Sequence, residues 1–106
     1  MTDHDPVASA CDQFGHESGL AWSIGATAEA LEVPAATLRA WDTRYGISPS
    51  HRSDGGHRRY TCEDIDRLRV MQRFQALGVP TREAAEQARS YSSEKLHAFA
   101  REALPA

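Results

Sequence analysis

Two short amphipathic helices are predicted between residues 23 and 46. Apolar and small residues recur at helical spacing after Ser23, a typical N-cap, and predict a first helix that ends before Pro34. Pro34 fits the opening of a second helix, because its missing amide hydrogen costs nothing there. The large apolar residues of this second helix share one face: Leu38, Trp41 and Tyr45. Gly46 marks its end, so the pair is a candidate helix-turn-helix.

The segment from residue 47 to residue 60 has the chemistry of a turn between two short strands. Residues 53–56 read Ser-Asp-Gly-Gly, and glycine readily adopts the positive φ angles that tight turns need. They separate Ser-His-Arg at 50–52 from His-Arg-Arg-Tyr at 57–60, which predicts a two-stranded hairpin. Such a pair is unstable alone and must pack on the helices.

Three more helices are predicted after the hairpin. Thr61 and Asp64 form a capping box, with Asp in the place of the usual Glu, and open the first of them. Its expected core face consists of apolar residues at helical spacing: Ile65, Leu68, Met71, Phe74 and Leu77. An alanine-rich helix follows from residue 80. Ser92 or Ser93 caps the last helix, whose large apolar residues are Leu96, Phe99 and Leu104.

Length and composition indicate one small domain behind a polar arm. The chain has 106 residues, within the usual range for a single domain. Residues 1–20 lack a hydrophobic period and carry four acidic residues but no Lys or Arg, so we expect a disordered acidic arm and a domain at 21–106. No apolar run approaches the ~20 residues of a membrane span, and no secretion signal is visible. We therefore expect a cytoplasmic protein.

Neither a catalytic centre nor a metal centre is indicated. The five histidines and two cysteines lack the C-x-x-C and H-x-x-x-H spacings of zinc sites. Gly55 and Gly56 lie between strands rather than between a strand and a helix, unlike a phosphate-binding loop. Acidic neighbours oppose a thiolate at Cys62, which is expected to be a half-buried structural residue. We expect no enzyme and no cofactor.

Basic charge is concentrated in the middle of the chain. Residues 37–73 contain eight arginines and five acidic residues, a local charge of +3, although the whole chain carries −3. Small residues at the start of the second helix, Ala36 and Thr37, permit close approach to a major groove, where Arg39 would reach a base or a phosphate. The basic hairpin would meet the backbone or the minor groove. The alternative is that these arginines form an ordinary solvated surface.

Four motifs, in a fixed order along the chain, resemble those of a known family. They are Ser-Ile-Gly at 23–25, Thr-Leu-Arg-Ala-Trp-Asp-x-Arg-Tyr-Gly at 37–46, Arg-x-x-Gly-Gly-His-Arg-Arg-Tyr at 52–60 and Leu-Gly-Val at 77–79. Over about residues 22–90 the chain closely resembles the winged helix-turn-helix domain of MerR transcription regulators. The motif variants look most like the branch of cobalamin-dependent light-responsive regulators. The resemblance implies a mainly α, winged helix-turn-helix fold with a two-stranded wing and additional C-terminal helices.

The resemblance also implies sequence-specific binding of double-stranded DNA in transcription regulation. Residues 35–44 would form the recognition helix, and residues 52–60 the wing. Charge pattern and resemblance together give these expected DNA-binding residues: Ala36, Thr37, Arg39, Arg44, Arg52, His57, Arg58, Arg59 and Tyr60. The chain departs from the family at Pro34, where a Ser or Thr cap is usual, and at Ala40, where many members have a phosphate-contacting tyrosine.

Two other functions fit the same sequence. An excisionase-like architectural protein shares the winged fold and would bend or coat DNA. A protein-interaction module would bind another regulator through the helices at 81–104. The family's cobalamin motif, Asp-x-His-x-x-Gly, and its C-terminal metal-binding cysteines do not occur, so we expect a separate or missing effector domain. No heptad pattern is present, which predicts a monomer or weak dimer that self-associates on DNA.

Overall fold

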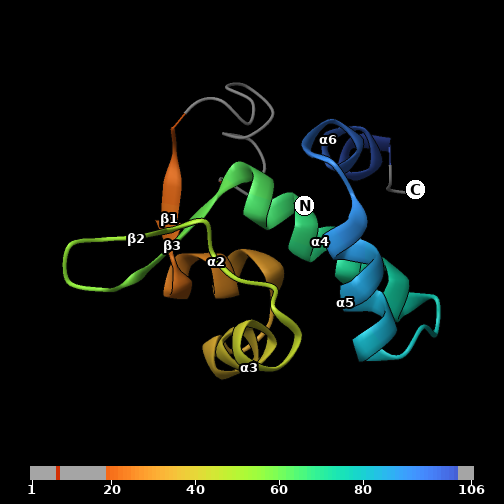
Figure 1. Cartoon of the computed structure of the whole chain (residues 1–106), viewed down its shortest axis with the longest axis horizontal. Coiled ribbons are helices and arrows are strands. Elements are labelled where there is room, and N and C mark those ends of the chain that lie inside the picture. The colour runs from red at the N-terminus through yellow and green to blue at the C-terminus, as the bar shows by residue number, and fades with distance from the viewer. Residues whose placement is uncertain (1–6, 8–18, 103–106) are drawn as a thin grey trace, which may run out of the picture.

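The computed structural model describes residue 7 and residues 19–102 (Figure 1), so most of the expected arm lies outside the described residues, as does Leu104. The elements are, in order, β1 (Ala21–Ser23), α2 (Ile24–Leu31), α3 (Ala35–Tyr45), β2 (His51–Arg52), β3 (Arg58–Thr61), α4 (Cys62–Ala76), α5 (Thr81–Ser90) and α6 (Ser93–Glu102). This is the predicted order of helices around a hairpin. Val7 is buried in the core.

The predicted two-stranded hairpin is confirmed as β2 and β3, and β1 extends it to a three-stranded antiparallel sheet of order β1-β3-β2. Trp22 of β1 lies opposite Tyr60 of β3, and Arg52 of β2 lies opposite Arg58. The sequence did not predict β1, because three residues are too few to show an alternating pattern. The loop between β2 and β3 projects away from the helices in Figure 1. The wing is therefore anchored on its inner side by the strand that leads into α2.

Local caps explain where α2 and α3 begin and end. The Ser23 hydroxyl accepts a hydrogen bond from the amide of Ala26 at 3.1 Å, so the predicted N-cap is confirmed. Pro34 is the N-cap of α3 and makes no side-chain hydrogen bond to it. Gly46 ends α3 with a φ of 70°, a conformation that favours glycine. The predicted boundaries of the helix-turn-helix thus agree with the structure.

The capping box predicted at the start of α4 is confirmed. The Thr61 hydroxyl accepts from the Asp64 amide at 3.2 Å, and the Asp64 carboxylate accepts from the Thr61 amide at 2.9 Å. The prediction that Leu77 faces the core is wrong, since this side chain is 73% exposed. The helix ends one residue earlier, and the chain turns away through Gly78, whose φ is 92°. Cys62, expected to be half-buried, is fully buried.

Helix α4 connects the helix-turn-helix with the C-terminal helices. The side-chain amide of Gln72 (Nε2) donates to the backbone carbonyl of Leu31 at the end of α2 at 2.9 Å. Arg67 donates to the carbonyl of Ala88 near the end of α5 at 2.6 Å. Leu96 of α6, which packs on α4, is fully buried. Among the described helices none is both long and apolar enough to cross a membrane.

Candidate nucleic-acid interface

Helix α3 presents one buried face and one exposed face. Leu38 and Trp41 are buried in the core. Ala36, Arg39 and Arg44 are exposed, and Thr37 is half-buried. Small side chains therefore lie at the start of the exposed face, and arginines lie further along it. This is the arrangement that a recognition helix needs in order to approach base edges closely.

The tip of the wing is a tight turn that presents His57. The Ser53 amide donates to the His57 carbonyl at 2.9 Å, and the Gly56 amide donates to the Ser53 carbonyl at 2.8 Å. The φ of Gly56 is 81°, as the glycine pair predicted. The His57 ring lies over Gly55, where a Cβ would meet its Cδ2 atom at 3.2 Å. His57 is exposed, so an ionisable ring stands at the end of the wing.

Helix α3 and the wing are joined by Asp42. Its carboxylate accepts from Nε of Arg58 at 2.9 Å and from Nη2 of Arg52 at 3.3 Å. The hydroxyl of Ser48, in the loop before β2, also donates to it. The Asp42 side chain is 11% exposed, whereas those of Arg58 and Arg52 are 24% and 47% exposed. Two of the predicted DNA-binding arginines are therefore held against α3.

The charge of Asp42 is stabilised by these partners. Burial raises the pKa of its carboxyl, but the hydrogen bonds from Ser48 and Arg58 and the charges of Arg58 and Arg52 outweigh burial and lower the pKa below its ordinary value. Asp42 is thus ionised at neutral pH. It offsets part of the positive charge of the wing while fixing the position of both arginines.

The base of the wing is fixed by a second aspartate. Asp64, which caps α4, also accepts from the amide of Ser50 at 2.8 Å and from its hydroxyl at 2.6 Å. The start of β2 and the start of α4 are therefore held by one carboxylate. The sequence indicated Asp64 as a cap only, because its partner lies fourteen residues away in the chain.

Two further predicted DNA-binding residues of β3, Arg59 and Tyr60, contact other parts of the fold. Arg59 is half-buried and its Nη2 donates to the carbonyl of Ala21 in β1 at 3.3 Å. Tyr60 is only 1% exposed, burial raises its pKa, and its hydroxyl has no hydrogen-bond partner. The ring of Tyr60 packs in the core at the base of the wing, which leaves little of this side chain exposed for a contact with DNA.

Asp42 is the residue of this surface that the sequence analysis missed. Its signal was a single acidic side chain on a helix whose other charged residues are arginines, but a single sequence does not show which arginines it meets. In the described part of the chain, no group of three or more His, Cys, Asp or Glu side chains is placed to hold a metal ion. The site is a basic, protruding surface.

Comparison with known proteins identifies relatives of the part of the chain that contains this surface. The profile of the MerR helix-turn-helix regulatory protein family matches residues 22–91. The chain is 39% identical over 74 residues to the transcriptional regulator MlrA of Salmonella typhimurium, a match that covers 70% of this chain and 30% of that protein. It is 35% identical over 65 residues to the transcriptional repressor CarH of Myxococcus xanthus, covering 61% of this chain and 22% of CarH.

A solved structure shares the fold. The crystal structure of a MerR-family transcriptional regulator from Bacillus cereus superposes with a TM-score of 0.63 and 34% sequence identity, over 78% of this chain and 66% of that one. The match to the curated relatives, in contrast, spans less than a third of their length. The similarity therefore concerns the part of these proteins that contains the helix-turn-helix and the wing.

Proposed function

Because the chain belongs to the MerR family of helix-turn-helix regulatory proteins, we propose that it binds double-stranded DNA sequence-specifically and regulates transcription from the nucleoid in the cytoplasm. The relatives named above are regulators and not enzymes, and the protein is not an enzyme. The exposed face of α3 enters the major groove, and the wing lies along the adjacent backbone.

One observation carries this proposal: Asp42 holds the wing arginines against the helix that presents Arg39. Helix and wing consequently form one continuous surface rather than two independent elements. Arg39 has neither a hydrogen bond nor an ion pair with any described residue, so its guanidinium is available to a base or a phosphate. A basic surface that includes an unpaired arginine is suited to a duplex.

The predicted residues take different roles in this proposal. Ala36, Thr37 and Arg39 face the bases, and Arg44 and His57 meet the backbone at the two ends of the surface. The remaining wing residues act mainly through position and charge, because each has an intramolecular partner: Arg52, Arg58 and Arg59. Tyr60 supports the wing from the core.

Selection of bound duplexes from a random pool, followed by fluorescence anisotropy, tests the proposal. The full chain is expected to enrich one sequence class. Arg39→Ala should weaken binding to that site by about tenfold or more, the usual value of a good base contact. Gln87→Glu lowers the net charge by the same amount, on the exposed side of α5, and is the matched control.

The salt dependence separates base contacts from phosphate contacts. Arg58→Ala should weaken binding and flatten the slope of log K against log salt, by about 0.9 for each phosphate that the variant no longer neutralises. If Arg39→Ala and Arg58→Ala both bind the enriched site as tightly as the unmodified chain at every salt concentration, the assignment is wrong. Absence of any binding to random DNA at low salt would instead favour a protein-interaction module.

A further inference from the structure

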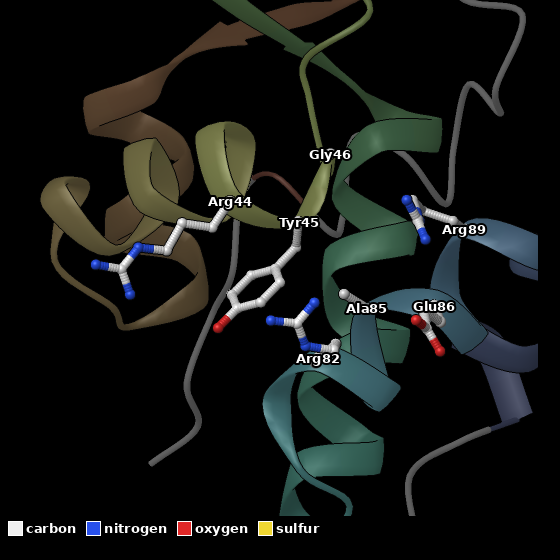
Figure 2. Close-up of a pocket in the computed structure, with 7 residues that line it drawn as sticks. All are labelled: Arg44, Tyr45, Gly46, Arg82, Ala85, Glu86 and Arg89. Atoms are coloured by element: carbon white, nitrogen blue, oxygen red, sulfur yellow. The ribbon is translucent and has the colours of Figure 1, made fainter.

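A pocket of about 230 Å³ opens between the end of α3 and the outer face of α5. Three arginines line it: Arg44, Arg82 and Arg89. Arg82, Glu86 and Arg89 of α5 lie at positions i, i+4 and i+7 and hence on one face of the helix. Figure 2 shows Arg82 extending from α5 toward the ring of Tyr45, with Arg89 on the side of Gly46. The pocket is outside the recognition surface except for Arg44, which lines both.

The three arginines of this pocket have no hydrogen bond or ion pair with any described residue. In the part of the chain with described side chains, the arginines of the wing and of α4 all have intramolecular contacts: Arg52, Arg58, Arg59, Arg67, Arg69 and Arg73. The arginines there without a hydrogen bond or an ion pair are Arg39, Arg44, Arg82 and Arg89. Three of these four line one pocket.

Unpaired like charges that share a pocket repel one another, and an anion relieves that repulsion. Glu86 is the acidic residue of the lining, and it forms no ion pair with the three arginines, so a charge of +2 remains. The Tyr45 hydroxyl adds a neutral donor at the edge. Gly46 lies beside Arg89 in this lining, since a Cβ at that position would be in ordinary van der Waals contact with Nη1 of Arg89, at 3.4 Å.

We propose that this pocket binds a phosphate group through Arg82 and Arg89. The Arg44 side chain, which extends away from these two in Figure 2, turns toward the pocket to complete the site. Guanidinium groups present fixed pairs of N–H donors that match the oxygens of a phosphate, and several of them can share one phosphate. The volume is below the range of ordinary ligand pockets, about 300–1,000 Å³, and suits a phosphate together with part of the group that it esterifies. The phosphate comes either from DNA bound at the neighbouring surface or from a free phosphorylated molecule.

The position of Arg44 gives the site a consequence for regulation. If the ligand is free, its phosphate competes with the DNA backbone for Arg44, and each ligand lowers the affinity of the other by the same factor. If the phosphate belongs to DNA, the surface that binds the duplex extends from the wing across α3 to α5. Only binding of a DNA phosphate rests on the proposed function. Binding of a free phosphorylated molecule and binding of a DNA phosphate therefore need separate measurements.

The first measurement uses the full chain without DNA. Inorganic phosphate and adenosine 5′-monophosphate are titrated at low ionic strength and followed by ¹H–¹⁵N spectra, with chloride as the control anion. Saturable shifts are expected at residues 44–46 and 82–89. Arg82→Ala combined with Arg89→Ala should weaken this binding by about tenfold or more. Gln87→Glu, on the same helix but outside the pocket lining, should leave it unchanged.

The second measurement uses the enriched duplex with single methylphosphonate substitutions. If DNA supplies the phosphate, one neutralised position weakens binding by the unmodified chain and has no further effect on the Arg82→Ala, Arg89→Ala variant. Saturable binding of free phosphate indicates that a free phosphorylated molecule is the ligand. A DNA position whose neutralisation affects only the unmodified chain indicates that DNA supplies the phosphate. The proposal is overturned if neither occurs, or if Gln87→Glu reproduces the effects of the combined Arg82→Ala, Arg89→Ala variant. A chain that binds no DNA would refute the proposed function. The phosphate titration alone would then test whether the pocket binds a phosphate group.

Discussion

Replacement of Asp42 by asparagine tests whether this residue holds the wing in place. The Arg58 contact joins two largely buried side chains at 2.9 Å, so it has the value of a hydrogen bond to a charged group, about 1.5–3 kcal/mol. The Arg52 contact is longer, at 3.3 Å, and that side chain is 47% exposed, which gives about 0.5 kcal/mol. Asparagine retains an acceptor for Ser48 but cannot form either ion pair. We therefore expect Asp42→Asn to lower the free energy of unfolding by about 2 kcal/mol.

Urea unfolding followed by circular dichroism at pH 7 measures this decrease. Asp54→Asn is the matched control, because it removes one negative charge at the exposed wing tip, where Asp54 has no described partner. A double-mutant cycle with Arg58→Gln should give a coupling free energy of about 1–2 kcal/mol. Equal urea midpoints for Asp42→Asn, Asp54→Asn and the unmodified chain would refute the role assigned to Asp42.

The same variant carries a pH signature. The pKa of Asp42 is lower in the folded chain than its ordinary value of 3.8, so the folded state releases its proton more readily than the unfolded state. Its contribution is therefore fully present above the unfolded pKa and is lost as the pH falls through the folded pKa. The stability difference from Asp42→Asn should stay constant from about pH 7 to 5 and shrink below about pH 4. A difference that persists at low pH would contradict the pKa shift.

Three further predictions concern the core and the oligomeric state. Tyr60→Phe removes a buried hydroxyl without a partner, so calorimetry should show an unchanged or higher stability, by up to about 1 kcal/mol, and anisotropy should show unchanged DNA affinity. Leu96→Ala should cost about 2–4 kcal/mol in urea unfolding, whereas Leu77→Ala, at a side chain 73% exposed, should stay within about 0.5 kcal/mol. Because Leu96 is buried within its own fold, sedimentation at tens of micromolar without DNA should give a monomer; a concentration-independent dimer mass would contradict this.

The helices were predictable because their signals are local. Ser23, Gly46 and the Thr61–Asp64 box mark boundaries through contacts within a few residues, and each acts in the structure as expected. Leu77 was misplaced because periodicity extends a helical face until something ends it, and the helix ends one residue before Leu77. Strand β1 was missed because its pairing partner lies almost forty residues further along the chain.

The candidate site was predictable in its position but not in its internal contacts. The arginines of α3 and of the wing were evident from composition and motif, whereas their separation into paired and unpaired groups depends on tertiary structure. Asp42 pairs with residues ten and sixteen positions away, and no single-sequence pattern specifies such a pair. The same holds for Arg82 and Arg89, which look like the solvated side of a helix until α3 is packed beside them.

The pairing of Asp42 leads to a last prediction, which concerns specificity. Asp42→Asn frees Arg52 and Arg58 and adds one positive charge, so binding to random duplex should tighten. The wing then no longer has a fixed position beside α3, and the enriched site must reorder it on binding, which offsets the electrostatic gain. Asp54→Asn adds the same charge to the wing without releasing either arginine. We expect the ratio of specific to non-specific affinity to fall by about five- to tenfold in Asp42→Asn relative to Asp54→Asn, at matched salt concentration. Equal ratios in the two variants would show that Asp42 contributes charge alone, and that the wing keeps its position without it.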